Sequence, residues 1–432
     1  MAKNKKEMTP EERLAAALVP EEEQPYELPE GWKWVYLGKI TTIVGGGTPS
    51  SRCPEYYDGG LIPWITPADL SDYTEVYISH GRRNITQLGL EKSSAKLMPE
   101  NTVLLSSRAP IGYVAIAANN VCTNQGFKSF LPSIHFLPKY LYWFLKGNQP
   151  MLQQYASGTT FLELSSKRAS EIRFPIAPLS EQQRLVARIE SLFAKLDAAK
   201  AKVQAVLDAH ETRKAALLHE AIAGDLIGAG EKELKPLSEI VDLIRIGPFG
   251  SALHKEDYIQ GGIPVVNPQH IVNQVICPDS RKSISESKAD SLAVYKMCVN
   301  DIIIGRRGEM GRTAPVGEDE AGWLCGTGCM LLRLKKEYDA KFYSLVIASQ
   351  KSKQYLETHA VGSTMKNLNE KIIRNLPVPV YSYAEQQEIV AILDRLLGRE
   401  EEVRQSAESV LAAIDSMKQS ILAQAFHGEL GA

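Results

Sequence analysis

Three arginines lie close together in one Gly-rich segment, Arg306-Arg307-Gly-Glu-Met-Gly-Arg312, directly after the apolar run from Asp301 to Ile304. An arginine guanidinium can bind a guanine edge through two hydrogen bonds, and it can also neutralise a phosphate. Arg108 follows the apolar run that begins at Val103 in the same way. These positions favour loops that are held by strands and contact nucleic acid.

Other loops carry side chains that can donate to and accept from base edges, because Asn and Gln suit adenine while Ser and Thr serve any base. In the first half of the chain we expect contacts from Thr48, Ser50, Ser51, Thr66, Asp69, Ser107, Arg108, Asn124 and Gln125. In the second half we expect them from Ser251, Asn267, Gln269, His270, Arg306, Arg307, Glu309, Arg312, Lys366 and Asn367. For any single residue among them, an ordinary turn is the simpler interpretation.

The known patterns of catalytic centres do not fit this sequence. Asn267-Pro-Gln-His lacks the second proline and the aromatic residue of an adenine-methylating motif. Gly45-Gly-Gly-Thr is not followed by the lysine that a phosphate-binding loop needs. Cys325 and Cys329 have no second Cys or His pair at zinc spacing. We therefore expect a chain without a catalytic centre, a metal or a cofactor of its own.

The charge of the chain is unevenly distributed. The formal net charge is −2 over 432 residues, a length that suggests two or three domains. Residues 28–178 hold 14 Lys and Arg against 10 Asp and Glu, and residues 234–381 hold 19 against 16. These stretches are thus +4 and +3, an excess that is modest but compatible with DNA contact. Six cysteines are too few for a disulfide framework, and no apolar run indicates a membrane span or secretion signal, so we expect a cytoplasmic protein.

The elements that must position these loops occur twice. Glu181-Gln-Gln returns as Glu385-Gln-Gln, and the same offset relates Ala221-Ile-Ala-Gly-Asp-Leu to Ala425-Phe-His-Gly-Glu-Leu. Upstream the similarity is looser and the offset drifts. Each half therefore consists of a variable globular part followed by a closely matched tail. Short apolar runs between turn residues, with helical spacing near 139–155 and 340–358, indicate a mixed α+β fold for the globular parts.

Both tails have the pattern of a coiled coil. Residues at alternating steps of four and three, from Leu185 to Leu217 and from Ile389 to Ile421, are mostly apolar. A helix of about 45 residues spans roughly 70 Å, so it cannot bury its apolar stripe inside one domain. The other tail of the same chain is the simplest partner. An antiparallel pairing would hold two globular domains apart with pseudo-twofold symmetry, and His210, Arg213 and Glu400 would then set the register.

Capping signals mark where helices begin and end. Ser180-Glu-Gln-Gln and Ser382-Tyr-Ala-Glu can each form a capping box, and Gly224 and Gly428 suit helix C-termini. Thr9-Pro-Glu-Glu predicts a short helix in the leader, residues 1–27, which has no counterpart in the second half. One hypothesis is that this helix docks a partner subunit.

This organisation resembles the DNA-specificity (S) subunit of type I restriction–modification systems. The paired stretches PLSEQQRLVARIE and YAEQQEIVAILD carry the resemblance, together with the pair KAALLHEAIAGDL and MKQSILAQAFHGEL and the opening LPEGWKWVYLGKI. The resemblance implies a leader at 1–27, target-recognition domains at 28–178 and 234–381, and spacer helices at 179–228 and 382–430. In that family each domain reads one half of a bipartite site in double-stranded DNA.

The resemblance also implies partners. Family members dock two methyltransferase subunits, and two restriction subunits complete the nuclease form. S-adenosylmethionine, ATP and Mg²⁺ are then expected on those partners rather than on this chain. Two other classes stay open from the residues alone. A coiled-coil scaffold for protein–protein interaction would fit the near-neutral charge, and a self-contained methyltransferase or nuclease would need motifs that the sequence does not display.

Overall fold

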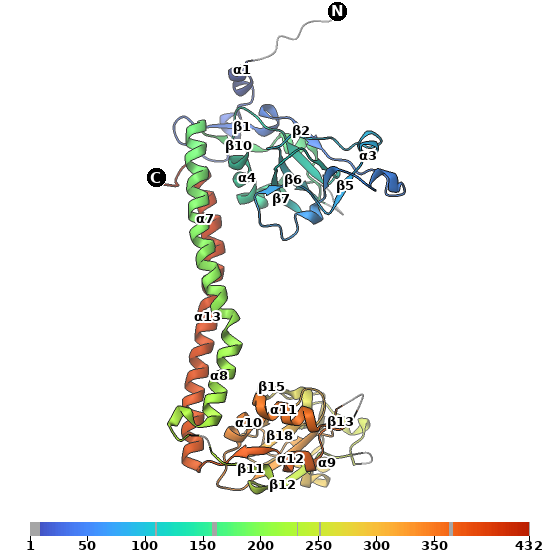
Figure 1. The fold of residues 1–432 in the computed structure, drawn as a ribbon, viewed down its shortest axis with the longest axis vertical. Coiled ribbons are helices and arrows are strands. Elements are labelled where there is room, and N and C mark those ends of the chain that lie inside the picture. The colour runs from blue at the N-terminus through green and yellow to red at the C-terminus, as the bar shows by residue number, and fades with distance from the viewer. Residues whose placement is uncertain are drawn as a thin grey trace, which may run out of the picture. The chain divides into compact units, whose positions relative to one another are not determined.

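The computed structural model describes residues 9–108, 110–157, 162–230, 232–249, 252–362 and 366–431. The chain divides into two compact units (Figure 1): unit 1 comprises Met1–Lys202 and Val410–Ala432, and unit 2 comprises Val203–Ser409. Each unit contains one α+β domain together with parts of the long helices. None of the described helices is both long and apolar enough to cross a bilayer.

The domain of unit 1 contains a five-stranded sheet and a three-stranded sheet. The first sheet has the order β2 (Ile43–Gly45), β9 (Phe127–Phe130), β6 (Val103–Ser107), β7 (Ile111–Ala117) and β4 (Tyr77–Ile78). The second has the order β5 (Arg83–Ile85), β3 (Ile62–Ile65) and β8 (Cys122–Thr123). A separate pair joins β1 (Lys33–Tyr36) to β10 (Arg173–Ile176). The helices are α2 (Leu37–Ile40), α3 (Gln87–Glu91), α4 (Pro138–Gly147), α5 (Gln149–Gln154) and α6 (Ser166–Ser170).

The domain of unit 2 repeats this plan. Its first sheet has the order β12 (Val241–Ile246), β21 (Cys329–Leu334), β18 (Asp301–Gly305) and β19 (Thr313–Pro315). Its second has the order β13 (Tyr258–Ile259), β17 (Ser283–Ile284), β14 (Ile263–Val266) and β20 (Leu324–Cys325). Two pairs join β15 (Ile271–Val272) to β16 (Val275–Ile276) and β11 (Leu234–Pro236) to β22 (Pro377–Pro379). The helices are α9 (Glu286–Ser291), α10 (Ala340–Ala348), α11 (Gln350–His359) and α12 (Glu370–Arg374).

The buried inner strand and the main buried helix of one domain have counterparts in the other, although the sheets differ in their number of strands. All five residues of β6 and all five of β18 are buried, as expected for strands covered on both faces. The helix α4 buries six consecutive residues from Tyr140 to Leu145, and α10 buries six from Phe342 to Ile347. The predicted helical stretches 139–155 and 340–358 are therefore each two helices, because Asn148 and Ser349 interrupt them.

The long helices are α7 (Leu179–Asp208), α8 (His210–Ala223) and α13 (Tyr383–His427). In unit 1, Lys200 Nζ lies 3.0 Å from Asp415 Oδ1, and Arg184 Nη2 donates to Leu430 O at 3.3 Å. The residue numbers thus rise along α7 while they fall along its neighbour. In unit 2, Arg213 Nε donates to Glu400 Oε2 at 2.8 Å. This ion pair accounts for two of the predicted polar register residues.

The first tail is not the single helix that the sequence predicts. It is interrupted at Ala209, where the carbonyl of Val206 accepts from Arg213 Nη2 at 3.1 Å. The predicted capping box at Ser180 is also wrong, because α7 begins one residue earlier at Leu179. The box at Ser382 is present, and both Gly224 and Gly428 end their helices with positive φ.

Only part of the heptad pattern is buried. Ile389, Leu393 and Ile414 are at most 3% exposed. Val403, Val410 and Met417, which follow each other at intervals of seven, are 42%, 44% and 53% exposed. One apolar stripe of α13 is therefore left uncovered, which the sequence pattern did not distinguish from the buried one.

The duplicated Glu-Gln-Gln motif fastens each domain to its long helix. Gln182 Oε1 accepts from Leu137 N at 2.9 Å, and its Nε2 donates to His135 O at 3.0 Å and Ala177 O at 2.9 Å. Gln386 bonds in the same way to the loop before α10 and to Tyr381 O. Both glutamines are fully buried. Each one satisfies three main-chain groups that would otherwise be buried without partners.

The leader forms part of unit 1. The helix α1 (Pro10–Ala15) begins at Thr9 with both hydrogen bonds of the predicted capping box. Ala17 and Val19 are buried, and Val19 N donates to Trp34 O on β1 at 3.0 Å. Tyr26 Oη donates to Phe426 O at 2.9 Å on the last turn of α13. Ala17, Val19 and Tyr26 therefore attach the leader to the rest of unit 1, while residues 20–25 between them are exposed.

Candidate nucleic-acid interface

Each domain has a short turn, directly after an inner strand, that holds several of the predicted contact residues. After β3, the turn η3 (Pro67–Asp69) is closed by Asp69, whose Oδ2 accepts from Thr66 N and Thr66 Oγ1 at 2.7 Å. After β14, the turn η8 (Pro268–His270) is closed by His270, whose Nδ1 accepts from Asn267 N at 3.2 Å. Proline at the first turn position suits both, because it needs no hydrogen-bond acceptor there.

In unit 1 this turn lies against two further loops. Thr48 Oγ1 donates to Gln125 Oε1, and Gly126 N donates to Asn124 Oδ1 at 2.9 Å. The loop that follows β2 can approach so closely because Gly46 has no side chain: a Cβ there would lie 1.9 Å from Asn124 O. Thr48, Asn124, Gln125, Thr66 and Asp69, which are far apart in the sequence, are thus brought to one region.

Two buried aromatic residues donate hydrogen bonds to main-chain carbonyls of the loop that follows β2. Trp64 Nε1 donates to Gly47 O at 2.9 Å, and Tyr57 Oη donates to Pro49 O at 2.6 Å. Ser50 and Ser51 continue from Pro49 and are exposed. Their hydroxyl groups are therefore accessible on a loop whose main chain is anchored on both sides.

A buried lysine on β9 lies next to the end of β6, and the sequence did not predict it. Lys128 on β9 is 7% exposed, and its Nζ lies 3.5 Å from both Ser107 Oγ and Glu163 Oε1. Ser107 is itself fully buried, so its hydroxyl faces this lysine and not the solvent. Arg108 is half-buried at the end of the same strand. The sequence signal was the lysine immediately beyond Thr-Asn-Gln-Gly-Phe.

In unit 2 the turn is organised by a buried imidazole. His270 is 5% exposed, and burial lowers its pKa, although Asp279 acts in the opposite direction. The lowered pKa favours the neutral imidazole, in which Nδ1 can accept from Asn267 N. Gln269 is exposed next to it, and Asn267 is half-buried. The chain at Gly326 passes so close to Asn267 that only glycine fits, because a Cβ there would be 2.5 Å from Asn267 Oδ1.

The Gly-rich arginine segment adds a charged group to the same turn. Arg312 Nη1 donates to Pro268 O at 3.1 Å, and its Nη2 lies 3.2 Å from Glu309 Oε2. Glu309 also accepts from Lys353 Nζ at 3.2 Å. These two cations lower the pKa of Glu309, Lys353 being the larger cause. Arg312 is thereby oriented by two acceptors, and Lys353 is a neighbour that sequence reasoning did not find.

Arg306 and Arg307 have different environments. Arg306 is 5% exposed, and its Nε donates to Leu368 O at 3.0 Å, so it supports the loop from within and does not present its guanidinium to solvent. Arg307 is exposed and forms an isolated bridge with Asn367. Lys366, next to it, is exposed, and its Nζ donates to Glu357 O at 3.2 Å. Ser251 lies outside the described residues.

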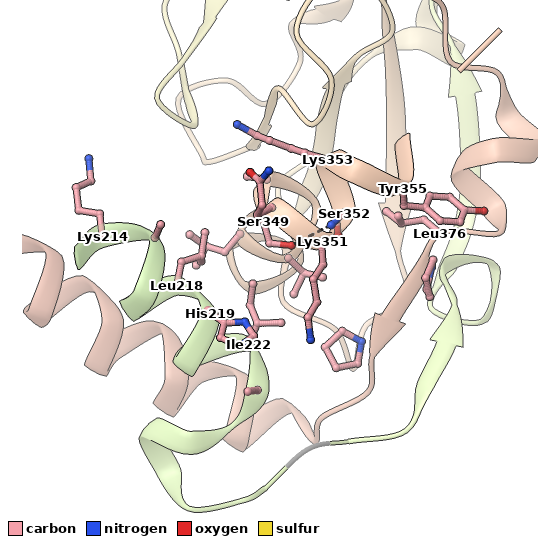
Figure 2. Close-up of a pocket in the computed structure, with 18 of the residues that line it drawn as sticks. Lys214, Leu218, His219, Ile222, Ser349, Lys351, Ser352, Lys353, Tyr355 and Leu376 are labelled. Atoms are coloured by element: carbon pink, nitrogen blue, oxygen red, sulfur yellow. Dashed lines mark hydrogen bonds between the residues drawn. The ribbon is translucent and has the colours of Figure 1, made fainter. Parts of the chain in front are cut away.

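A cavity of unit 2 lies away from these loops. It has a volume of about 440 Å³ and is lined by α8, α10, α11 and β22. Figure 2 shows Leu218, His219 and Ile222 of α8 on one side and Ser349, Lys351 and Ser352 on the other. Of the expected contact residues, none lines this cavity. Across the described part of the chain, no cluster of His, Cys, Asp and Glu has the arrangement of a metal site.

Two matches to one protein family cover most of the chain. Residues 29–208 and 231–408 each match the model of the type I restriction modification DNA specificity domain. A curated relative, the type I restriction enzyme MjaIX specificity subunit of Methanocaldococcus jannaschii, is 34% identical over 305 residues, which is 67% of this chain and 69% of the relative. The match therefore extends over both halves of the molecule.

Solved structures agree at the level of the fold. The HsdS subunit from Thermoanaerobacter tengcongensis is 19% identical, with a TM-score of 0.66, and the alignment covers 94% of this chain and all of that one. A chain from a study of complex assembly and conformational transition in a type I R-M system is 21% identical, with the same TM-score and coverage. Given two matched domains and a relative of this identity, the chain belongs to the family of type I restriction–modification DNA specificity subunits.

Proposed function

We propose that this chain reads a bipartite sequence in double-stranded DNA, one half with each domain. The observation that carries the proposal is the pair of loop clusters built on one shared scaffold. Each cluster surrounds a turn closed by its third residue, Asp69 in one domain and His270 in the other. The scaffold is the same while the accessible side chains differ, as expected for two domains that read different base pairs.

The exposed side chains of each cluster are those that can read base edges or contact phosphate. In domain 1 they are Thr48, Ser50, Ser51 and Gln125. In domain 2 they are Gln269, Arg307, Glu309 and Lys366. The buried members, Ser107, His270 and Arg306, support the loops instead.

We further propose that α7, α8 and α13 form an antiparallel coiled-coil spacer that sets the gap between the two half-sites. The ion pairs Lys200–Asp415 and Arg213–Glu400 support this arrangement, each within its own unit. Pseudo-twofold symmetry would then follow from the duplication of domain and tail. We also propose that two methyltransferase subunits dock on the long helices; exposed apolar residues of α13, Val403 in unit 2 and Val410 and Met417 in unit 1, support this.

Catalysis and its cofactors belong to the partners in this proposal. S-adenosylmethionine would be bound by the methyltransferase subunits, and ATP and Mg²⁺ by restriction subunits where these join the complex. This chain contributes the choice of sequence and the geometry that brings an adenine to the partner's active site.

Exchange of one domain tests the assignment directly. Residues 28–178 are replaced by the corresponding domain of another specificity subunit, and the hybrid is expressed with its methyltransferase. Mapping of methylated adenines should show one altered half-site, while the other half-site and the gap stay unchanged. The reciprocal exchange of residues 234–381 is the matched control and should alter only the second half-site. If either exchange altered both halves or neither, the assignment of one half-site to each domain would fail.

The same assay separates DNA readout from a pure scaffold. A scaffold without readout predicts no sequence-dependent methylation and no retardation of any duplex, with or without the methyltransferase. Sequence-specific binding that depends on both domains supports the proposed function.

A further inference from the structure

A pair of basic residues next to each candidate interface is duplicated more faithfully than the loops themselves. His80-Gly-Arg82-Arg83-Asn-Ile precedes and forms β5 in unit 1, and Asp279-Ser-Arg281-Lys282-Ser-Ile precedes and forms β17 in unit 2. The strand registers are equivalent, because Ile85 pairs with Ile62 on β3 and Ile284 pairs with Ile263 on β14. None of these four cations is among the residues expected from the sequence to contact DNA.

The inner cation of each pair lies over a tyrosine ring. Arg83 Cζ is 4.0 Å from the ring centroid of Tyr57, and Lys282 Nζ is 5.0 Å from that of Tyr258. A cation over an aromatic face is held in place without losing its charge. Each tyrosine in turn contacts its candidate interface: Tyr57 Oη donates to Pro49 O, and Tyr258 interacts with the side chain of Asn267.

The outer arginine of each pair is held by a carboxylate, and its side chain is largely exposed to solvent beside that carboxylate. Arg281 Nε and Nη2 donate to Asp279 Oδ1 and Oδ2 at 3.0 and 3.1 Å, and Arg82 Nε lies 3.9 Å from Asp69 Oδ1, so a phosphate would share or replace these ion pairs. Arg82 N donates to Asp69 Oδ1 at 2.9 Å, and Arg281 N donates to Asp279 Oδ1 at 3.0 Å. The two carboxylates come from different positions in the sequence, yet each accepts from the backbone nitrogen of the equivalent arginine. The side chains of Arg82 and Arg281 are 79% and 80% exposed. Surface ion pairs of this kind contribute little to stability, so folding alone does not explain the duplication.

We propose that Arg82–Arg83 and Arg281–Lys282 bind phosphates of the DNA backbone, one pair in each half-site. This inference rests on the proposed function and extends it. The two domains differ in the loops that would read bases, whereas the basic pairs are built alike. A feature common to both half-sites must recognise what both half-sites share, and that is the phosphate backbone rather than the base sequence. Phosphate contacts fix the position of each domain on the duplex.

Substitution of the outer arginines tests this. The variants are Arg82→Gln, Arg281→Gln and the double variant, each in the full chain with its methyltransferase. Binding to a short duplex that carries the methylated site is measured over a series of salt concentrations. Each lost phosphate contact should reduce the slope of log K against log salt by about 0.9. The corresponding loss of affinity is roughly eightfold per contact near 0.1 M salt.

Two kinds of control variant are available. Lys39→Gln with Lys371→Gln removes two exposed charges from α2 and α12, away from β5 and β17, and should leave the slope unchanged. Arg82→Lys keeps the charge and should restore most of the slope. Because the substituted side chains are exposed, all variants should melt at the temperature of the parent protein.

The outcomes separate this inference from the proposed function. If Arg82→Gln and Arg281→Gln behave like the charge controls, or if either changes the methylated sequence, the phosphate assignment is overturned while DNA readout stands. If the parent complex binds no duplex selectively, the proposed function itself fails, and this inference fails with it. A smaller slope with an unchanged recognition sequence supports the inference.

Discussion

Replacement of Gln182 by methionine tests whether the repeated Glu-Gln-Gln motif holds each domain on its helix. Methionine is similar in length but cannot donate a hydrogen bond, and its thioether sulfur is only a weak acceptor. The substitution removes three hydrogen bonds, to Leu137 N, His135 O and Ala177 O, at a fully buried site. The partners that remain are main-chain groups of the loop before α4 and of the segment before α7.

The expected loss follows from the number of bonds. At about 1 kcal/mol for each bond, the free energy of unfolding of unit 1 should fall by about 3 kcal/mol, and by more where a main-chain group stays dry. For a unit of about this size, each kcal/mol shifts the melting temperature by roughly 2–4 °C. The melting transition of unit 1 should therefore fall by roughly 6–12 °C in calorimetry of the full chain.

The adjacent glutamine provides a matched control. Gln183 lies on the same helix and is exposed, so Gln183→Met should leave the melting temperature close to that of the parent. Gln386→Met, with Gln387→Met as its control, repeats the comparison in unit 2. If Gln182→Met melted at the same temperature as Gln183→Met, the motif would not have the structural role assigned to it here.

Three further results are expected. Gly46→Ala should destabilise unit 1 by about 1–3 kcal/mol, because its Cβ would meet Asn124 O. The same variant should abolish methylation that depends on the first half-site. Gly45→Ala is the control: a Cβ at Gly45 meets open space, so this variant should be neutral in the same melting and methylation assays. Burial lowers the pKa of His270, so this residue contributes stability that is present above its unfolded pKa of about 6.5 and is lost as the pH falls through the lower folded pKa. The free energy of unfolding of His270→Asn, measured against pH, should lack this loss. An identical pH profile in both proteins would contradict the prediction. Four residues added to each spacer helix should lengthen the spacer by about 6 Å and widen the methylated gap by roughly two base pairs, and a change in either half-site would count against a spacer role.

Much of the architecture could be predicted because it is encoded locally. The heptad steps from Leu185 and Ile389, the capping box at Ser382 and the terminal Gly224 and Gly428 are short-range signals, and helices form there. The duplication at an offset of 204 residues identified two domains with matched tails. The failures were also local: Ser180 lies inside α7, and the first tail is interrupted at Ala209, where Arg213 Nη2 donates to the carbonyl of Val206.

The candidate interface was predicted less completely. Loop composition identified Thr48, Gln125 and Gln269, which are exposed beside their turns. It did not distinguish Arg306, which is buried under its loop, from Arg307, which is exposed next to it. Adjacent residues of one type share the same local signals, and only packing against distant segments separates them.

The sequence by itself determined that the chain is a tandem of two α+β domains, each followed by a long amphipathic helix, because periodicity and internal repeats depend only on neighbouring residues and on residue order. Tertiary structure decided which polar side chains reach solvent, that Asp69 and Asp279 fix equivalent arginines from unrelated positions, and which apolar stripe of α13 stays uncovered. Burial and hydrogen bonding are set by segments that the fold brings together from far apart in the chain. No local pattern encodes those distances.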